Sequence, residues 1–494
     1  MQQVGDQKQA HGAPKQERIP SMSQNSAVPV VAELSSASGS QITGKGLSVA
    51  DAIAILVGVV VGIGIFGFPP LVALNAPSAA TYMGLWVAGG AVMLIGALCY
   101  AELGGAYPDA GGEYAFLGRA WGANVALLFA WARCSIIQTG AIAAVAFIFG
   151  DYAQVLLPLG EHGPAIYAAL VVFVLTVINV LGSTESRRVQ RVLTVASVLA
   201  LVFMAIGGLI LGNADAASSV ASLGMDSGGG AVSAANQAVP SMGELAGMLG
   251  MGMVFVLLTY GGWNEAAYLS GEIRDVGRNM FRVLLYGTLI IVALYVLVNL
   301  AYLRVFGLEG LRSTHAVGAD MSRLLAGPWA AVLLSLIVCC TAMGTVNACI
   351  FTGGRVYVSL GRDVPAMKSL GAWSVKRETP VRALWLQGAI TLALVAFGAY
   401  AENGLQAMVA YTSPVFWLFM MLTALALIRL RERDPHHARP FKVPLYPITP
   451  LILALVCLGL CWSSLVYAGS GSVLGLLVLI LGLPLCSLRK RSGL

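Results

Sequence analysis

Two glycine-rich interruptions occur inside long apolar segments of this chain. The first is Gly62-Ile63-Gly64-Ile65-Phe66-Gly67 with Pro69-Pro70 after it, and the second is Tyr260-Gly261-Gly262-Trp263-Asn264-Glu265. Glycine lowers the cost of non-helical backbone, and a following proline caps or kinks the segment that resumes. An interrupted helix exposes amides at the start of one half and carbonyls at the end of the other, which attract a carboxylate and an ammonium group respectively. Together these ends match the two charges of an amino acid.

The first interruption has two other interpretations. The pattern Gly62-x-Gly64-x-x-Gly67 matches the dinucleotide-binding fingerprint, but that motif needs a strand before it and an acid about 20 residues further on. Here it lies in an apolar run with no Asp or Glu between Gly67 and Glu102, which excludes nicotinamide binding. The spacing of Gly58 and Gly62 also permits close contact between helices. We expect helix contact for Gly58 and a cavity lining for Gly62 to Gly67.

Arg133 and Glu265 are ionisable residues within predicted spans, where a charge needs a partner or water. Glu265 follows the second interruption by one turn, so it either caps the resuming helix or faces a bound substrate. Arg133 is expected to pair near the inner face of the membrane. Tyr260 and Trp263 are expected to wall the site, whereas Gln138 and Asn347 either contact substrate or form hydrogen bonds between helices.

An enzyme is the first rival function. A membrane enzyme needs a clustered acid, base or metal set. The five histidines all fall in tails or predicted loops: His11, His162, His315, His436 and His437. We therefore predict no catalytic residue, no metal site and no cofactor.

The elements that position these residues are membrane-spanning helices. Of 494 residues, 58% are hydrophobic and 11% are charged, whereas soluble domains carry roughly one-quarter charged residues. An apolar run of about 20 residues crosses the bilayer as a helix because its backbone is satisfied internally. Twelve runs are predicted: 48–72, 80–103, 123–150, 163–182, 191–212, 245–271, 282–304, 327–359, 382–400, 405–429, 446–468 and 472–488.

Basic residues support this number of spans and orient the chain. With a cytoplasmic amino terminus, every Lys and Arg falls on the cytoplasmic side except Arg133, Arg304, Arg312 and Arg323, as the positive-inside rule requires. The net charge of +6 is thus a topology signal and calls for no nucleic-acid partner. Both termini are predicted to be cytoplasmic.

The chain divides into two halves around a Gly, Ala and Ser-rich loop. Five predicted spans precede this loop and seven follow it, and an odd number per half inverts the second half. All eight cysteines fall inside predicted spans, so we expect no disulfide-linked subunit. The predicted divisions are a disordered cytoplasmic tail (1–44), a first five-helix repeat (45–212), a flexible extracellular or periplasmic loop (213–244), an inverted second repeat (245–429), and two peripheral helices with the carboxyl terminus (430–494).

Four ordered motifs resemble a known family. They are Gly62-Ile63-Gly64-Ile65-Phe66, Ala101-Glu102-Leu103 with Gly111-Gly112-Glu113-Tyr114, Tyr260-Gly261-Gly262-Trp263-Asn264, and Asn347 with Arg355 and Gly361-Arg362-Asp363. In this order and helical context they resemble the amino acid, polyamine and organocation transporters, and within them bacterial permeases similar to the L-type amino acid exchangers. The resemblance covers about residues 45 to 429. It implies an all-α fold in the bacterial inner membrane, with a ten-helix inverted repeat of the leucine-transporter type, broken first and sixth helices, and two peripheral helices.

The resemblance also implies which residues bind substrate. In such proteins the main chain around Gly62 to Phe66 binds the carboxylate and part of the amine, and that around Leu258 to Gly261 completes the amine site. Ile63 and Leu258 depart from the residues usual in the family, so the resemblance does not identify the pocket for the substrate side chain. The candidate substrate-binding residues are Gly62, Ile63, Gly64, Ile65, Phe66, Gln138, Leu258, Tyr260, Gly261, Trp263, Asn264, Glu265 and Asn347.

Ser197 is the candidate ion-coupling residue. Relatives that run without sodium often carry a lysine where this chain has Ser197. The predicted function is alternating-access transport of an amino acid or related amine, by exchange or by symport with sodium or protons. A transporter-like nutrient sensor that signals through the 44-residue tail is the second rival.

Overall fold

The computed structural model of this protein describes residues 48–107, 112–182, 187–211, 241–262, 273–374, 377, 379–467 and 469–487. Nine helices within these ranges are long and apolar enough to cross a membrane. One of the nine consists of α7 (Ala123–Ala132) and α8 (Gln138–Leu156), which are joined through a π-helical turn at Arg133–Ile137. The others are α5 (Ala79–Ala106), α9 (Gly163–Leu181), α12 (Met242–Thr259), α14 (Val276–Ser313), α16 (Pro328–Asp363), α17 (Val381–Ala399), α18 (Gly404–Arg433) and α19 (Ile448–Tyr467).

The three other predicted spans are helical but shorter or interrupted. The first consists of α2 (Val49–Val60), α3 (Gly64–Gly67) and α4 (Pro69–Leu74), so its predicted interruption is confirmed. In α10 (Arg187–Leu211) the apolar part is Val195–Ile210, and the last span is divided into α20 (Ser470–Ile480) and α21 (Leu483–Ser487). The described part of the chain is therefore all-helical, and nine of its helices are long and apolar enough to cross a membrane.

Local sequence fixes where several of these helices begin. The Ser78 side chain accepts a hydrogen bond from the Thr81 amide and caps α5. Ser241 and Glu244 form a reciprocal capping box at the start of α12. Pro164 and Pro328 occupy the first turns of α9 and α16, where a missing amide costs nothing. These residues define the ends of helices whose interiors are almost uniformly apolar.

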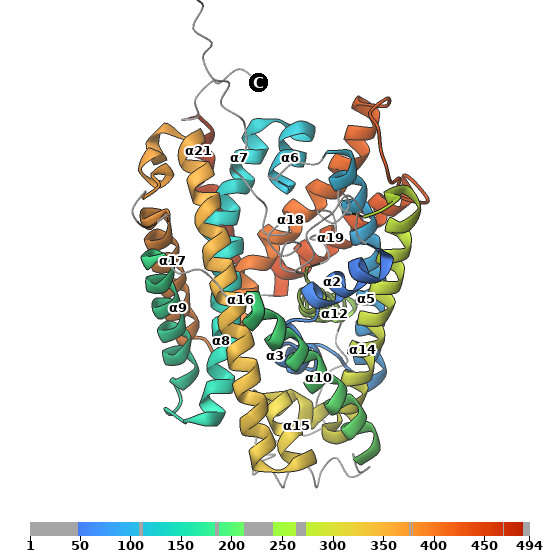
Figure 1. Ribbon diagram of the computed structural model, residues 1–494, viewed down its shortest axis with the longest axis vertical. Helices are drawn as coiled ribbons and strands as arrows, with labels where there is room; N and C mark the ends of the chain where they lie inside the picture. Colours follow the sequence, from blue (N-terminus) through green and yellow to red (C-terminus); the bar gives the residue numbers. More distant parts are fainter. Residues whose placement is uncertain are drawn as a thin grey trace, which may run out of the picture.

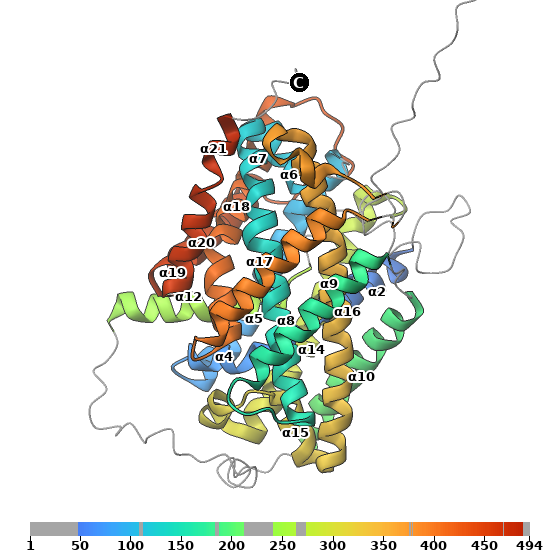
Figure 2. The ribbon, with the colours of Figure 1, turned by 90° about the vertical axis from the view of Figure 1, so that its left-hand side faces the viewer.

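Short helices lie at the two ends of the molecule. Helix α15 (Val317–Ala326) is at one end, and α6 (Glu113–Trp121) is at the other end with α7 and α21 (Figures 1 and 2). Helix α14 is kinked at Gly307, whose φ of +66° is a conformation that favours glycine. The chain then continues to α15. Helix α15 packs against α16 and α10 and also contacts α3.

The interrupted helices lie in the middle of the bundle. Figure 1 shows α2, α3 and α12 at mid-height, between the ends formed by α15 and by α6. Helix α14 packs along α5, α2 and α10, and α16 packs along α8 and α9. Helices α19 and α20 pack on α18, and Figure 2 shows α19, α20 and α21 along one flank.

The outer faces of the bundle are apolar. Exposed side chains include Leu170 and Phe173 on α9, Leu199 and Ile206 on α10, and Leu455 on α19. Large contiguous apolar surface on a soluble monomer is rare, whereas lipid tails solvate such side chains directly. The outer surface therefore suits a bilayer.

Candidate functional site

The interruption of the first span exposes main-chain amides. Helix α2 ends at Val60 and α3 begins at Gly64, and the cap residue Ile63 provides no side-chain cap. Among the described residues, the amides of Ile63, Gly64 and Ile65 have no hydrogen-bond acceptor, although all three residues are buried. Buried amides without partners are rare in folded proteins. Amides at the start of a helix are the groups to which proteins often bind anions.

The second interruption follows the end of α12. Helix α12 ends at Thr259, and Tyr260 to Gly262 form a turn in which Gly262 has a φ of +103°. The Gly261 amide closes this turn by donating to the Leu258 carbonyl at 3.1 Å. The other predicted residues of this segment, Trp263, Asn264 and Glu265, lie outside the described residues.

The structure brings the two interruptions into direct contact. A Cβ atom added at Gly64 would lie 3.0 Å from the Cα of Thr259 and 3.2 Å from the Phe68 ring. The main chains around Gly64 and Thr259 therefore lie too close to leave ordinary room for a side chain at Gly64. The first interruption therefore lies against the end of α12.

Tyr295 of α14 connects the carbonyl ends of the two half-helices. Its hydroxyl donates to the Val60 carbonyl at 3.0 Å and lies 3.5 Å from the Thr259 carbonyl. Those carbonyls belong to the last residues of α2 and α12, which have no amide partner within their own helices. Sequence reasoning missed Tyr295, and its one signal was a hydroxyl in the middle of an apolar helix.

Aromatic rings surround this junction. The Tyr260 hydroxyl donates to the Trp86 carbonyl of α5 at 3.0 Å. The ring centroids of Tyr260 and Tyr295 are 5.1 Å apart, and Trp86 lies 6.0 Å from Tyr260 and 6.2 Å from Tyr295. All three side chains are fully buried. Tyr260 thus anchors the end of α12 among aromatic side chains.

The glycines of the first interruption have different roles. A Cβ atom at Gly62 would meet only the Val60 carbonyl, at 3.8 Å, so this position is open. One at Gly67 would lie 2.6 Å from Ile148 of α8, so Gly67, like Gly64, permits close helix contact. The cavity interpretation therefore fits Gly62, whereas helix contact accounts for Gly64 and Gly67. Ile65 and Phe66 are fully buried.

The uncharged polar candidates form hydrogen bonds between helices. Gln138 donates to the Cys349 carbonyl of α16 at 3.0 Å. The Asn347 side-chain oxygen accepts a hydrogen bond from the side-chain Nδ2 of Asn179, on α9, at 2.6 Å. Ser197, the candidate ion-coupling residue, lies buried with its hydroxyl 3.0 Å from that of Thr341, between α10 and α16.

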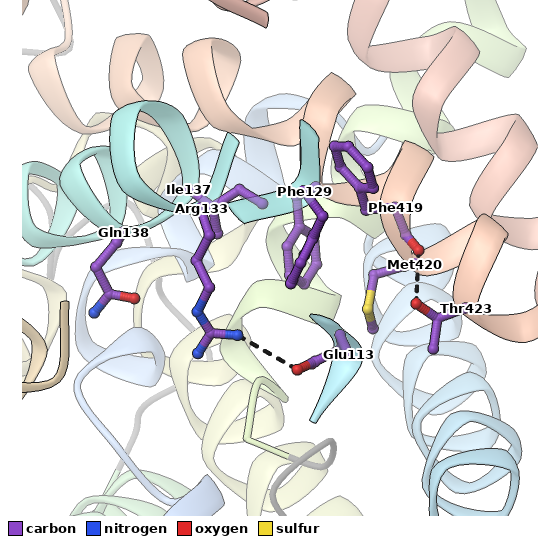
Figure 3. Close-up of a pocket in the computed structure, with 9 residues that line it drawn as sticks. Glu113, Phe129, Arg133, Ile137, Gln138, Phe419, Met420 and Thr423 are labelled. Carbon is purple, nitrogen blue, oxygen red and sulfur yellow. Dashed lines mark hydrogen bonds and ion pairs between the residues drawn. The ribbon is translucent and has the colours of Figure 1, made fainter. Parts of the chain in front are cut away.

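A cavity of about 90 Å³ lies between α6, the α7–α8 segment and α18. Figure 3 shows Arg133 and Glu113 facing each other across it, with an Nη1 to Oε2 distance of 3.4 Å. Arg133 is 32% exposed and Glu113 8%, so the predicted pairing of Arg133 is confirmed. The described lining residues are Glu113, Phe129, Arg133, Ile137, Gln138, Phe416, Phe419, Met420 and Thr423.

A π-helical turn between α7 and α8 lines this cavity through Arg133 and Ile137. The Gln138 amide donates to the Arg133 carbonyl, five residues back, which defines a π-helical turn. Such turns occur often at functional sites. Gln138 belongs both to this lining and to the predicted substrate contacts.

The described residues contain no group of three or more His, Cys, Asp or Glu side chains that could bind a metal ion. All eight cysteines lie in helices and are free thiols.

Comparison with known proteins decides the family. The family profile described as "Amino acid permease" matches residues 47–482, most of the chain. The chain belongs to the amino acid permease family. This confirms the resemblance found in the sequence motifs, and it makes the protein a membrane transporter rather than an enzyme.

Named relatives of this permease are mammalian transporters. It is 29% identical over 426 residues to the mouse (Mus musculus) "b(0,+)-type amino acid transporter 1", covering 85% of this chain and 83% of the relative. The human (Homo sapiens) protein of the same name is 29% identical over 433 residues, with the same coverage. The mouse "Large neutral amino acids transporter small subunit 2" is 28% identical over 460 residues, covering 92% of this chain and 82% of that protein.

Proposed function

We propose that this permease carries an amino acid across the membrane by alternating access, holding it by main-chain groups where the two interrupted helices meet. The observation that carries the proposal is the set of three buried amides at Ile63, Gly64 and Ile65 without an acceptor in the described chain, placed against the end of α12. The relatives named as amino acid transporters support the same substrate class.

The two charged groups of an amino acid have separate places in this arrangement. The carboxylate accepts hydrogen bonds from the amides at the start of α3, where the helix dipole is positive. The ammonium group donates to the carbonyls at the ends of α2 and α12, where the dipole is negative. Trp263, Asn264, Glu265, Gln138 and Asn347 stay predicted contacts of the substrate side chain.

The proposed architecture has twelve spans. Residues 45–212 form the first five-helix repeat and 245–429 the inverted second one, with α19 and the α20–α21 pair as peripheral helices. Both termini face the cytoplasm of a cell whose plasma membrane holds the permease. Impermeant maleimide applied from outside should then label a cysteine at exposed Glu161 but not one at Arg433, and the reverse labelling would invert this topology.

The coupling ion is sodium or a proton if the permease is a symporter, and neither is needed if it is an exchanger. Ser197 and Thr341 offer two hydroxyl oxygens to a cation between α10 and α16. A sodium gradient that drives uptake in the wild type but not in Ser197→Ala would support this site. Equal sodium dependence in both proteins would remove it.

Uptake into proteoliposomes tests the proposed function. Each of the twenty amino acids is supplied in labelled form, with sodium and pH gradients varied separately and with internal amino acid present or absent. Uptake of at least one amino acid that exceeds protein-free vesicles supports transport. A protein that binds amino acids, shown by a thermal shift, yet transports none under any gradient would instead be a sensor.

A further inference from the structure

A hydrogen-bond chain connects α15 to the interrupted first span. The Tyr152 hydroxyl, from α8, donates to the Phe66 carbonyl at 3.0 Å. The same oxygen accepts from the Gly318 amide of α15 at 3.0 Å. Tyr152 is fully buried, and its ring meets that of Phe66 edge-on at 6.3 Å. One side chain thus joins three elements, α3, α8 and α15.

The first turn of α15 is shaped to receive this hydroxyl. A Cβ atom at Gly318 would lie 2.9 Å from the Tyr152 oxygen and 3.1 Å from the Phe66 ring. Gly318 is the second residue of α15, whose amide has no acceptor within its own helix. The cap residue Ala316 provides no side-chain acceptor, so Tyr152 fulfils that function from another helix.

Helix α15, in the packed position that the structure shows, covers the Phe66 end of the proposed substrate-binding segment. Val317, Ala319 and Met321 of α15 are fully buried, as are Ile65 and Phe66. Phe66 closes the segment whose amides we assign to the substrate carboxylate. Any movement of α15 away from the bundle must break the bond between Gly318 and Tyr152 or carry Tyr152 and Phe66 with it.

We propose that Tyr152 is a positioning residue that couples the seating of α15, as a cover at this end of the molecule, to the position of the Phe66 end of α3. When α15 is seated, the shared hydroxyl holds the Phe66 carbonyl and hence the half-helix that follows the break. When α15 lifts, that half-helix loses its anchor. The inference adds a residue and a moving element to the proposed site, and its transport test rests on the proposed function.

Labelling of a buried cysteine tests the coupling without reference to transport. Ala319→Cys places a thiol on the buried face of α15, and its reaction with a water-soluble maleimide in the purified protein is followed by mass spectrometry of the peptide containing residue 319. Adding Tyr152→Phe is expected to raise the labelling rate roughly tenfold, because a buried hydrogen bond contributes on the order of that factor to an equilibrium. Tyr167→Phe is the matched control, since its hydroxyl donates to the exposed Leu157 carbonyl.

Labelling in Tyr152→Phe within twofold of the parent would overturn the proposal. If Tyr152→Phe fails to fold, Gly318→Ala decides, because its methyl group pushes against the hydroxyl while leaving Tyr152 intact. Fast labelling in that variant supports the coupling, and slow labelling overturns it.

Transport supplies a second readout that a merely structural role would not change. With whichever amino acid the wild type takes up best, Tyr152→Phe should raise KM severalfold for substrate supplied on the α15 side and leave KM from the opposite side unchanged. Equal changes in KM from both sides would contradict a side-specific cover. If no amino acid is transported while the labelling effect appears, the proposed function fails and the coupling stands.

Discussion

At the scale of single residues, the Tyr295 hydroxyl satisfies the Val60 carbonyl at the first interruption and lies 3.5 Å from the Thr259 carbonyl at the second. The density of glycine at Gly62 to Gly67 marks a break whatever the fold, because glycine acts on its own backbone. Tyr295 could not be assigned in this way, since its role depends on α14 lying beside both α2 and α12. Side chains that act across helices become visible only when the helices are placed.

Tyr295→Phe should reduce substrate affinity by roughly tenfold with little loss of folded protein. The variant keeps the ring and removes the hydroxyl that satisfies the Val60 carbonyl, so a buried acceptor is left without its donor. Uptake kinetics with the best wild-type substrate measure the effect. Tyr286→Phe on the exposed face of the same helix is the control. Equal KM values for the two variants would show that the hydroxyl has no part in the site.

Asp320 makes stability depend on pH. Burial raises the pKa of this carboxyl from 3.8 to about 6, with Arg323 acting in the opposite direction. A pKa raised by folding means that the folded state holds its proton longer, so stability falls as the pH rises from about 4 to 6 and is level above that. Asp320→Asn should remove this decrease of stability with pH. At pH 7 the variant should be more stable than the wild type by at most about 2 to 3 kcal/mol.

Thermal unfolding at several pH values checks this. The Asp320→Asn and wild-type curves should converge near pH 4, where both side chains are neutral. The exposed Glu161, changed to Gln, controls for the loss of one charge. A constant difference between Asp320→Asn and the wild type across the whole range would contradict the assignment.

At the scale of elements, the positions of the helices follow from hydropathy, but their internal geometry does not. Apolar runs predict every long helix, because the bilayer leaves no other way to satisfy the backbone. The π-helical turn at Arg133–Ile137 and the division of the last span into α20 and α21 arise from packing between helices and have no clear sequence pattern. The same limit applies to Gly64, whose contact with Thr259 is set by the meeting of two segments distant in sequence.

Gly64→Leu should cost both substrate binding and stability. The added side chain collides with the Thr259 backbone, which cannot move without displacing the end of α12, and overpacking typically costs about 1–3 kcal/mol or more. Gly84→Leu is the matched control, because nothing lies within 4 Å of a Cβ atom there. Melting in detergent with and without substrate separates the two effects. Normal melting of Gly64→Leu would show that the breaks do not touch as described.

At the scale of the whole molecule, one buried carboxylate connects α5 to the end of α18 and to the loop that follows α18. Glu102 near the end of α5 is 2% exposed and accepts hydrogen bonds from Arg431 at 2.6 Å and from the Val443 amide at 2.6 Å, with Arg439 at 3.6 Å. The sequence places Glu102 near the end of the predicted span 80–103, where an interfacial salt bridge and simple solvation are equally ordinary roles. It could not show that both basic partners come from the end of α18 and the following loop, more than 300 residues away.

Glu102→Gln should destabilise the protein by about 3 kcal/mol, because it leaves the partly buried guanidinium groups of Arg431 and Arg439 without their counter-charge. Glu309→Gln breaks the ion pair with Arg312, in which Glu309 is 83% exposed, and should change stability by less than about 0.5 kcal/mol. Thermal unfolding of both variants measures the difference. Equal effects would show that burial at Glu102 contributes nothing.

The most direct test of the main-chain site is competition by substrate analogues that each lack one charge. Uptake of the best labelled amino acid is measured against the unlabelled amino acid, its carboxamide and its N-acetyl derivative. If the amides of Ile63 to Ile65 bind the carboxylate and the ends of α2 and α12 bind the ammonium group, each derivative should compete at least about 100-fold less well, because it loses charge-assisted hydrogen bonds. Competition by either derivative as strong as that of the parent amino acid would contradict a site built from the two interrupted helices.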